Sequence, residues 1–313
     1  MKILLTGISS FTGFWFAEEL SNKGHEVIAT LTKNSPDEYE GIRKERISLI
    51  LDKVTPVFGS RFGDAVFNEI IESGIDVLCH HGSEVTDYKS IKFDIANAVK
   101  QNTNNIIGVI EHLKKNNCSS IVYTGSVFEP NEGSGTKPLD AFSPYGLSKS
   151  LTYEILRYYC STFEIKLGKF VIPNPFGPFE EARFTNYLIQ NWFNGKTPEV
   201  KTPDYIRDNI HADLLAKAYE SFVQKVFNGN NPESKTNPGL YAESQGAFTG
   251  RVAHEMETRL NIKCDFKLLK QTDFSEPLER INTDRIRDVF NWNESAAWDR
   301  LADYYSTKYI NRV

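Results

Sequence analysis

The sequence predicts an α/β protein built on a doubly wound parallel sheet, followed by a smaller C-terminal lobe. Two observations predict this fold class. Short apolar runs without polar alternation, typical of strands covered on both faces, alternate with segments of helical periodicity as far as residue 172. A segment rich in proline and glycine, residues 173–178, then ends the alternation. Strands joined by helices form right-handed crossovers, which give a parallel sheet.

Local patterns predict the elements in order. Residues 2–5 form a buried strand, and a glycine turn leads from it into a helix at residues 13–22. Gly24 ends that helix before a second strand at residues 25–31. Further strands are expected at residues 75–80, 120–124 and 169–172, and further helices at residues 64–72, 93–114, 143–159, 250–260 and 296–305. Residues 34–56 show no clear pattern, and residues 228–239, rich in Asn, Gly, Pro and Ser, predict a surface loop.

Composition excludes several classes of protein. With 313 residues, 40% hydrophobic and 25% charged, the chain is an ordinary globular protein rather than a disordered or fibrous one. The net charge of -5 provides no basic field for nucleic acid or an anionic membrane, and no apolar run is long enough to cross a bilayer. The four cysteines lack the spacing of a metal or redox site, which predicts buried thiols in a reducing compartment. We therefore expect a cytoplasmic protein without a metal.

The turn after the first strand predicts a dinucleotide site. Gly7 permits a tight turn at the strand exit, and Ser10, Phe11 and Thr12 follow it at the start of the helix. Gly13 allows the helix to pack closely on the strand, and the helix N-terminus stabilises phosphate charge. The second strand ends without the acidic residue that would accept hydrogen bonds from the NAD ribose. Thr32 and Lys33 stand there instead and could meet a 2′-phosphate, which favours NADP moderately over NAD.

A second motif predicts proton transfer. Tyr145 and Lys149 lie four residues apart on one face of the helix that Ser143 and Pro144 begin. An ammonium group next to a phenol lowers the phenol pKa, so the pair can exchange a proton with a substrate oxygen while hydride moves at the carbon. Thr124 ends a predicted strand, at the sheet edge where ligands bind, and could hydrogen-bond the same oxygen.

Together these residues resemble the extended short-chain dehydrogenase/reductase family, in its branch of nucleotide-sugar epimerases, dehydratases and reductases. The resemblance covers nearly the whole chain. Residues 6–13 are similar to the family's TGxxGxxG turn, with Ser10 in place of the middle glycine, and residues 145–149 to its YxxxK. Residues 174–178 resemble its N-x-[YF]-G-P segment, and residues 205–213 its RD-[FY]-[IV]-H-V-x-D segment.

The resemblance implies a Rossmann-type domain at residues 1–173, with a returning segment at about 205–230, and a substrate-binding lobe at residues 174–204 and 231–313. It also implies a homodimer through a four-helix interface, made by the predicted helices 93–114 and 143–159 of each subunit. The helix at 143–159 carries more apolar residues than one sheet-facing stripe requires, as expected of a second buried face.

The resemblance also assigns residues to ligands. The catalytic set is Thr124, Tyr145 and Lys149. The cofactor would be bound by Gly7, Ser10, Phe11, Thr12, Gly13, Thr32, Lys33, His80, Gly82, Asn102, Tyr145 and Lys149. The substrate would be contacted by Glu84, Thr86, Ser126, Asn174, Arg183 and Arg207, with Arg207 on the nucleotide diphosphate. A second diphosphate-binding arginine, expected near residue 272, is not apparent.

The function expected from these features is NAD(P)-dependent oxidoreduction at a sugar carbon, C4, of a nucleotide-linked sugar, within carbohydrate biosynthesis. The missing acid after the second strand favours 4-ketoreduction with NADPH; a 4-epimerase with tightly bound NAD is the alternative. Gly125 and Ser126 stand where 4,6-dehydratases carry Asp-Glu, which disfavours dehydration. A non-catalytic dinucleotide sensor is a remote alternative. The nucleotide base and the sugar stay open.

Overall fold

The protein, as a computed structural model, is described at residues 1–135 and 139–310 and divides into two compact units. Unit 1 comprises residues 1–132, 139–172 and 216–237. Within the described residues, unit 2 comprises 133–135, 173–215 and 238–310. The segment 216–237 returns to unit 1 after the chain has passed through unit 2.

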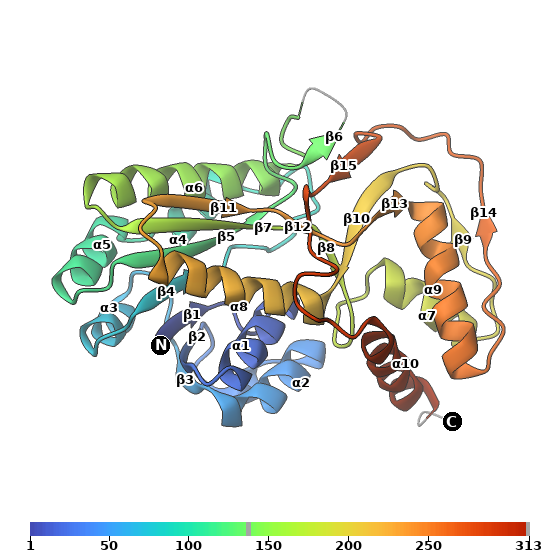
Figure 1. Ribbon diagram of the computed structural model, residues 1–313, viewed down its shortest axis with the longest axis horizontal. Coiled ribbons are helices and arrows are strands. Elements are labelled where there is room, and N and C mark those ends of the chain that lie inside the picture. The colour runs from blue at the N-terminus through green and yellow to red at the C-terminus, as the bar shows by residue number, and fades with distance from the viewer. Residues whose placement is uncertain (136–138, 311–313) are drawn as a thin grey trace. The chain divides into compact units, whose positions relative to one another are not determined.

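Unit 1 is built on a seven-stranded sheet in which every neighbouring pair is parallel. The strand order is β11-β7-β5-β4-β1-β2-β3 (Figure 1). The strands are β1 Lys2–Thr6, β2 Glu26–Leu31, β3 Thr55–Phe58, β4 Val77–His80, β5 Ser120–Ser126, β7 Lys166–Ile172 and β11 Glu233–Thr236. This architecture confirms the predicted α/β fold with a doubly wound parallel sheet.

Helices cover both faces of this sheet. They are α1 Phe11–Asn22, α2 Gly41–Ile50, α3 Ala65–Glu72, α4 Ile95–Asn102, α5 Ile106–Lys115, α6 Pro144–Thr162 and α8 Ala212–Asn228, with short 3-10 turns at Pro36–Glu38 and Leu51–Lys53. Apolar side chains of α3, α5 and α6 share one buried cluster with β1, β4 and β5. On the other face, Phe16 of α1 stacks on Tyr219 of α8, and both rings contact Phe170 of β7.

Two predicted elements of unit 1 were wrong. The expected helix at 93–114 is two helices, because Asn105 adopts a left-handed conformation with φ of 49°. The break lets Asn104 and Asn105 donate side-chain hydrogen bonds to the carbonyl groups of Phe62 and Gly63. The expected surface loop at 228–239 contains β11, which pairs with β7 as an edge strand and is polar because only one side of it is covered. Residues 34–56, which showed no pattern, contain α2 and β3.

In its described residues, unit 2 contains a smaller mixed sheet and the three helices α7, α9 and α10. The sheet runs β13-β10-β15-β6, and β8 also pairs with β10. Its strands are β6 Ser134–Gly135, β8 Asn174–Phe176, β10 Ile206–His211, β13 Tyr241–Ser244 and β15 Glu279–Ile281. The short pairs are β9 Glu199–Val200 with β14 Lys267–Leu268, and β12 Pro238–Gly239 with β16 Asp284–Arg285. The helices α7 Phe184–Phe193, α9 Gln245–Leu260 and α10 Glu294–Ile310 bury a core rich in aromatic residues.

Two further features of the chain concern its helices and its cysteines. In the parts of the chain that the structure describes, no helix combines the length and the apolarity needed to cross a membrane. All four cysteines are buried free thiols, and burial raises the pKa of Cys79 and Cys160 to about 12. These thiols are therefore uncharged and unreactive at neutral pH.

Candidate active site

The turn between β1 and α1 has the geometry of a dinucleotide cradle. Gly7 has a φ of +81°, and a Cβ there would lie 2.7 Å from the Cα of Gly82. A Cβ on Gly13 would lie 2.2 Å from the carbonyl oxygen of Gly7. Ser10 caps α1 by accepting the Gly13 N–H at 3.1 Å. The turn therefore needs both glycines, and it presents a helix N-terminus that fits the diphosphate of a dinucleotide.

A histidine that we did not predict lies against this turn. His81 Nε2 is 3.0 Å from Ser10 Oγ and 3.2 Å from Thr12 Oγ1. Burial lowers the pKa of His81 to about 3, so the ring is neutral at pH 7. The pair of histidines at the strand end, His80 and His81, was the sequence signal for this contact, but we assigned the cofactor contact to His80 alone.

His80 is held inside unit 1. Its Nε2 donates to the Asn102 carbonyl oxygen at 2.9 Å, and Nδ1 is 3.4 Å from Thr6 Oγ1. The Asn102 side chain accepts the Glu84 N–H at 2.9 Å and donates to Ser83 and Thr152. His80 and Asn102 are both buried, and Asn102 bonds Ser83 and Glu84, so together they hold the loop after β4 in place. In this loop Gly82 donates its N–H to Thr6 Oγ1 at 2.7 Å.

The loop after β4 also carries Glu84 and Thr86. The Glu84 carboxylate accepts the Thr86 N–H at 2.6 Å. Partial burial raises the pKa of Glu84, but the hydrogen bonds from Thr86 outweigh it and lower the pKa below its ordinary value. Both residues therefore lie in one ordered turn, with Glu84 ionised at neutral pH. Thr32 and Lys33, by contrast, are exposed at the end of β2.

Tyr145 and Lys149 lie on the first turns of α6. Ser143 caps the helix by accepting the Gly146 N–H at 3.2 Å, and Pro144 occupies its first position. The Tyr145 ring contacts Tyr88 and Phe93 edge-on, at centroid distances of 5.5 and 6.1 Å. Lys149 is 2% exposed, and its Nζ lies 4.3 Å from the centroid of the Tyr123 ring. Burial lowers the pKa of Lys149 to about 8.

Thr124 faces the other side of the sheet. Tyr123 points toward α6, and its phenol donates to the Lys149 carbonyl oxygen at 2.8 Å; the next residue along a strand points the opposite way. Thr124 Oγ1 is buried beside the Tyr219 phenol, although neither hydroxyl meets hydrogen-bond geometry in the described part of the chain. Tyr145 and Lys149 thus lie one helical turn apart on α6, whereas Thr124 Oγ1 makes no hydrogen bond with any described residue.

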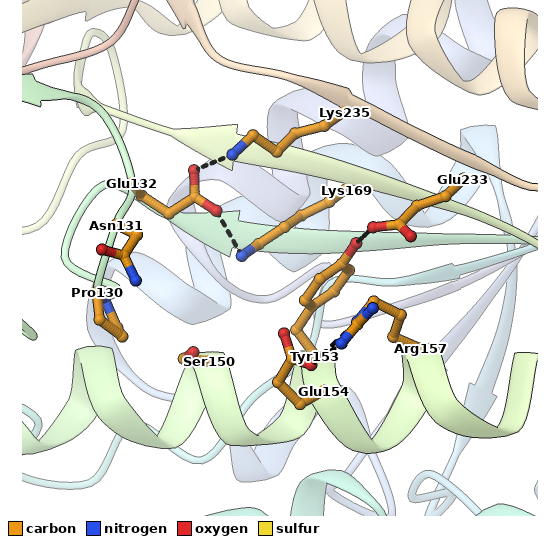
Figure 2. Close-up of a pocket in the computed structure, with 10 residues that line it drawn as sticks. All are labelled: Pro130, Asn131, Glu132, Ser150, Tyr153, Glu154, Arg157, Lys169, Glu233 and Lys235. Carbon is orange, nitrogen blue, oxygen red and sulfur yellow. Dashed lines mark hydrogen bonds and ion pairs between the residues drawn. The ribbon is translucent and has the colours of Figure 1, made fainter. Parts of the chain in front are cut away.

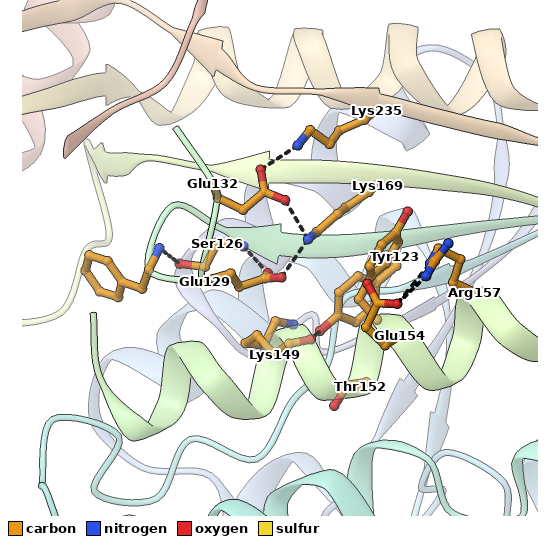
Figure 3. A network of polar contacts seen from close by, with 12 residues as sticks. Tyr123, Ser126, Glu129, Glu132, Lys149, Thr152, Glu154, Arg157, Lys169 and Lys235 are labelled. Atoms are coloured by element: carbon orange, nitrogen blue, oxygen red, sulfur yellow. Dashed lines mark hydrogen bonds and ion pairs between the residues drawn. The ribbon is translucent and has the colours of Figure 1, made fainter. Parts of the chain in front are cut away.

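Beneath α6 lies a group of charged residues that sequence reasoning missed, which we call the buried charge cluster: Glu129, Glu132 and Lys169. Lys169 Nζ is 2.7 Å from a carboxylate oxygen of each acid (Figure 3). Glu129 also accepts the Ser126 N–H at 2.7 Å, and Ser126 Oγ in turn accepts the Phe128 N–H. Lys169 was visible as a charge in the apolar strand β7, but its partners lie 37 and 40 residues away.

A pocket of about 290 Å³ opens beside this cluster (Figure 2). Its lining residues come from α6, β7, β11 and the loop after β5: Pro130, Asn131, Glu132, Ser150, Tyr153, Glu154, Arg157, Lys169, Glu233 and Lys235. Among its charged groups, Lys235 pairs with Glu132 at 2.9 Å and Arg157 with Glu154 at 2.6 Å, and Glu233 accepts a hydrogen bond from the Tyr153 phenol. Within residues 1–135 and 139–310, no cluster of three metal-binding side chains occurs.

Three residues predicted to contact substrate belong to unit 2. Arg207 of β10 donates to Glu276 at 2.9 Å, and its guanidinium lies 4.6 Å from the Tyr205 ring centroid. Arg280 of β15 is its register partner. Asn174 lies on β8, opposite Asn209 of β10. Arg183 caps α7 and is 3.6 Å from Glu181, half exposed.

Comparison with known proteins supports the sequence motifs. Residues 3–239 match the family described as the NAD dependent epimerase/dehydratase family. A protein of Methanocaldococcus jannaschii, named provisionally as a UDP-glucose 4-epimerase, is 23% identical over 255 residues, covering 75% of this chain and 79% of that protein.

Two solved structures share the fold over nearly the full length of this chain. The UDP-glucose 4-epimerase of Stenotrophomonas maltophila, with bound NAD and formylated UDP-arabinopyranose, gives a TM-score of 0.75 at 17% identity, over 100% of both chains. A mutant UDP-glucuronic acid 4-epimerase of Bacillus cereus, with NAD and a 4-fluoro analogue of UDP-glucuronic acid, gives 0.75 at 16% identity, over 99% of this chain and 100% of that one.

Proposed function

Since the chain belongs to the NAD dependent epimerase/dehydratase family of enzymes, we propose that it acts at C4 of a nucleotide-linked sugar and inverts that carbon. The observation that carries this proposal is the Tyr145–Lys149 pair, one helical turn apart on α6, in the same unit as the glycine turn of β1 and α1. The similarity to two 4-epimerases over nearly the whole chain supports epimerisation ahead of ketoreduction.

In this proposal Tyr145 takes the proton of the C4 hydroxyl and later returns it. A phenol is a poor base at neutral pH, so it needs the positive charge of Lys149 close to its hydroxyl. Thr124 was expected to hydrogen-bond the same substrate oxygen, but its Oγ1 is buried beside Tyr219 on the face of β5 opposite α6, so Tyr145 and Lys149 alone carry the proton transfer in this proposal. The bound dinucleotide supplies the hydride chemistry. Its diphosphate would lie on the turn of Gly7, Ser10, Phe11, Thr12 and Gly13.

The substrate contacts remain part of the proposal. Arg207 is the residue we assign to the nucleotide diphosphate, because a guanidinium fork binds phosphate oxygens in pairs. Asn174, Arg183, Ser126, Glu84 and Thr86 are the further contacts that we propose along the substrate.

Ketoreduction with NADPH is the second candidate, and one observation favours it. Thr32 and Lys33 are exposed at the end of β2, with no acid at either position, so an ammonium could meet a 2′-phosphate. A retained, tightly bound NAD would favour the epimerase, and a site that takes up added NADPH would favour the reductase.

The deciding experiment is an assay with two arms. The protein is incubated with UDP-glucose or UDP-glucuronic acid, with no added dinucleotide, and the C4 epimer is separated by anion-exchange chromatography. A parallel arm supplies NADPH and a 4-keto sugar nucleotide. Tyr145→Phe should lower turnover about 10²–10⁴-fold in the active arm, the usual contribution of general acid–base catalysis. Bound dinucleotide without turnover in either arm would point to a dinucleotide sensor.

We also propose a homodimer in the cytoplasm. On α6, Leu147, Leu151 and Tyr158 are exposed and recur at helical spacing, and Ile107 of α5 is exposed as well. An apolar stripe of this kind is suited to pairing with the same helices of a second copy, as in a four-helix interface. Leu151→Glu should shift the protein to a monomer in sedimentation velocity at micromolar concentration. A wild-type protein that is already monomeric there would contradict the proposal.

A further inference from the structure

The buried charge cluster lies beside Lys149. Figure 3 shows the Glu129 carboxylate between the side chains of Lys169 and Lys149. Glu129 is fully buried, Lys169 is 4% exposed and Lys149 is 2% exposed. Three charges are therefore held close together where water does not screen them, and their interactions are much stronger than between exposed groups.

The two acids of the cluster have different surroundings. Glu132 borders the pocket of Figure 2 and is bonded to the half-exposed Lys235 and to Asn237, at 2.9 and 3.1 Å. Glu129 is bonded to Lys169 and to the Ser126 N–H, away from solvent. Lys235 and Lys169 thus neutralise the charge of Glu132 next to the pocket. The charge of Glu129 lies deeper and acts on Lys149.

Lys149 has no other negative charge to balance it. Among the described residues, its Nζ has no hydrogen-bond or ion-pair partner, and the nearest group is the Tyr123 ring. The titratable groups around it are Tyr123 of β5, His80 at the end of β4, His81 after that strand and Lys169 of β7, with Tyr145 one turn away on its own helix. At pH 7 the Tyr123 phenol and both imidazoles are neutral and Lys169 is positive, so among the described residues Glu129 is the anion that acts on Lys149.

We propose that Glu129 is a positioning residue that keeps Lys149 charged, so that Lys149 can hold the Tyr145 phenolate. This inference rests on the proposed function for the role of Tyr145, but not for the charge of Lys149. Burial lowers the pKa of Lys149; Glu129 opposes that shift and Lys169 adds to it. Without Glu129, an uncompensated Lys169 would drive Lys149 toward its neutral form.

Two glycines make this arrangement possible. A Cβ at Gly125 would lie 2.8 Å from Glu129 Oε1 and 2.9 Å from Lys169 Cε, so the strand end must lack a side chain where the ion pair forms. A Cβ at Gly146 would lie 2.1 Å from the Phe128 carbonyl oxygen. The first turn of α6 therefore packs directly on the loop that carries Glu129, which fixes Lys149 close to the carboxylate.

The test compares Glu129→Gln with Glu132→Gln, which removes the other acid of the same cluster. The pKa of Lys149 is measured by NMR on lysine labelled at Cε, and its resonance is assigned as the one lost in Lys149→Arg. In Glu129→Gln the pKa of Lys149 should fall by about one unit or more, the effect of losing an opposite charge at short range. In Glu132→Gln it should stay within error of the wild type.

The pH profile gives a second readout. The acid limb of kcat/KM, which reports the ionisation of Tyr145, should move upward by about one unit in Glu129→Gln, a tenfold loss on that limb. The double variant Glu129→Gln/Lys169→Met removes one attraction and one repulsion together, so it should recover most of the Lys149 pKa. If Glu129 has a purely structural role, the pKa of Lys149 should not recover in the double variant.

The outcomes separate this inference from the proposed function. An unchanged Lys149 pKa in Glu129→Gln, or no recovery in the double variant, would overturn the inference. If Tyr145→Phe retains full turnover, the proposed function fails, and the NMR titration, which needs neither substrate nor dinucleotide, still decides whether Glu129 sets the charge of Lys149.

Discussion

Replacing Lys169 by methionine is the most direct test of how the buried charge cluster stabilises unit 1. Methionine keeps the apolar stem of the lysine, whose Nζ lies 4.3 Å from the centroid of the Tyr153 ring, so little packing is lost. What is lost is the ammonium group that pairs with Glu129 and Glu132 at 2.7 Å each. Glu132 keeps Lys235 and Asn237, so Glu129 is the acid left without its ion-pair partner.

The expected loss in the free energy of unfolding follows from the burial of the Lys169 ion pairs. Removing one partner of a buried ion pair costs about 3–5 kcal/mol, and the lower end applies here because one of the two acids keeps other partners. The loss should depend on pH in a defined direction. Burial already raises the pKa of Glu129, and Lys169 opposes that rise. In Lys169→Met the pKa therefore rises further, the folded state binds the proton, and stability falls as pH rises from the ordinary value of 4.5.

The assay is urea unfolding followed by circular dichroism, at pH 5.5 and at pH 8. We expect about 3 kcal/mol lost at pH 8 and clearly less at pH 5.5, where Glu129 in the variant can be protonated. Lys235→Met is the matched control, since this lysine also pairs with Glu132 but is half exposed, and it should cost at most about 1 kcal/mol. Equal losses for the two variants, or a loss that does not change with pH, would refute the reasoning.

Three further predictions concern other sites. Gly13→Ala should abolish dinucleotide binding, measured by fluorescence titration, because its Cβ would lie 2.2 Å from the Gly7 carbonyl oxygen and the turn must open; an unchanged Kd would contradict the cradle. Arg207→Ala should raise KM strongly, and Arg207→Lys should recover part of that loss. The Arg207 side chain is 13% exposed and also donates to the Ile206 and Leu278 carbonyl oxygens, so Arg207→Ala should lower the melting temperature as well; an unchanged KM at a lowered melting temperature would assign Arg207 to the fold alone. Burial raises the pKa of Glu180 to about 8, so the wild type should lose stability as pH rises from 4.5 to 8. Glu180→Gln should flatten that pH dependence in calorimetric scans at pH 6, 7 and 9. If the melting temperatures of the two proteins follow parallel curves against pH, Glu180 is ionised in the fold.

The sequence was sufficient to predict the sheet and most of its helices, because periodicity and glycine placement are local signals. The strands β1, β2, β4, β5 and β7 lie where apolar runs predicted them. The break between α4 and α5 could not be predicted, since it depends on the close approach of Asn104 to Gly63, 41 residues away in the chain. The strand β11 was missed for a related reason: as an edge strand it is polar, and it is a strand only because β7 offers it hydrogen bonds.

Residues of the candidate site were predictable where a motif fixed them on one element. Tyr145 and Lys149 share a helix, and Gly7 and Gly13 share a turn, so spacing alone placed each pair. His81 and Glu129 were missed because each acts through contacts with residues of other elements, which the sequence alone does not bring together. His81 faces the hydroxyl groups of Ser10 and Thr12, and Glu129 faces two lysines from other elements.

Gly125 connects the buried charge cluster to the kind of reaction the protein can catalyse. In the sequence family that this chain resembles, the 4,6-dehydratases carry an acidic pair directly after the strand-end threonine, and here those positions are Gly125 and Ser126. The space that a side chain at 125 would fill is taken by Glu129 and Lys169. Glu129 cannot substitute as a general acid, because its carboxylate is paired with Lys169 at 2.7 Å. An acid at 125 would therefore have to displace this pair.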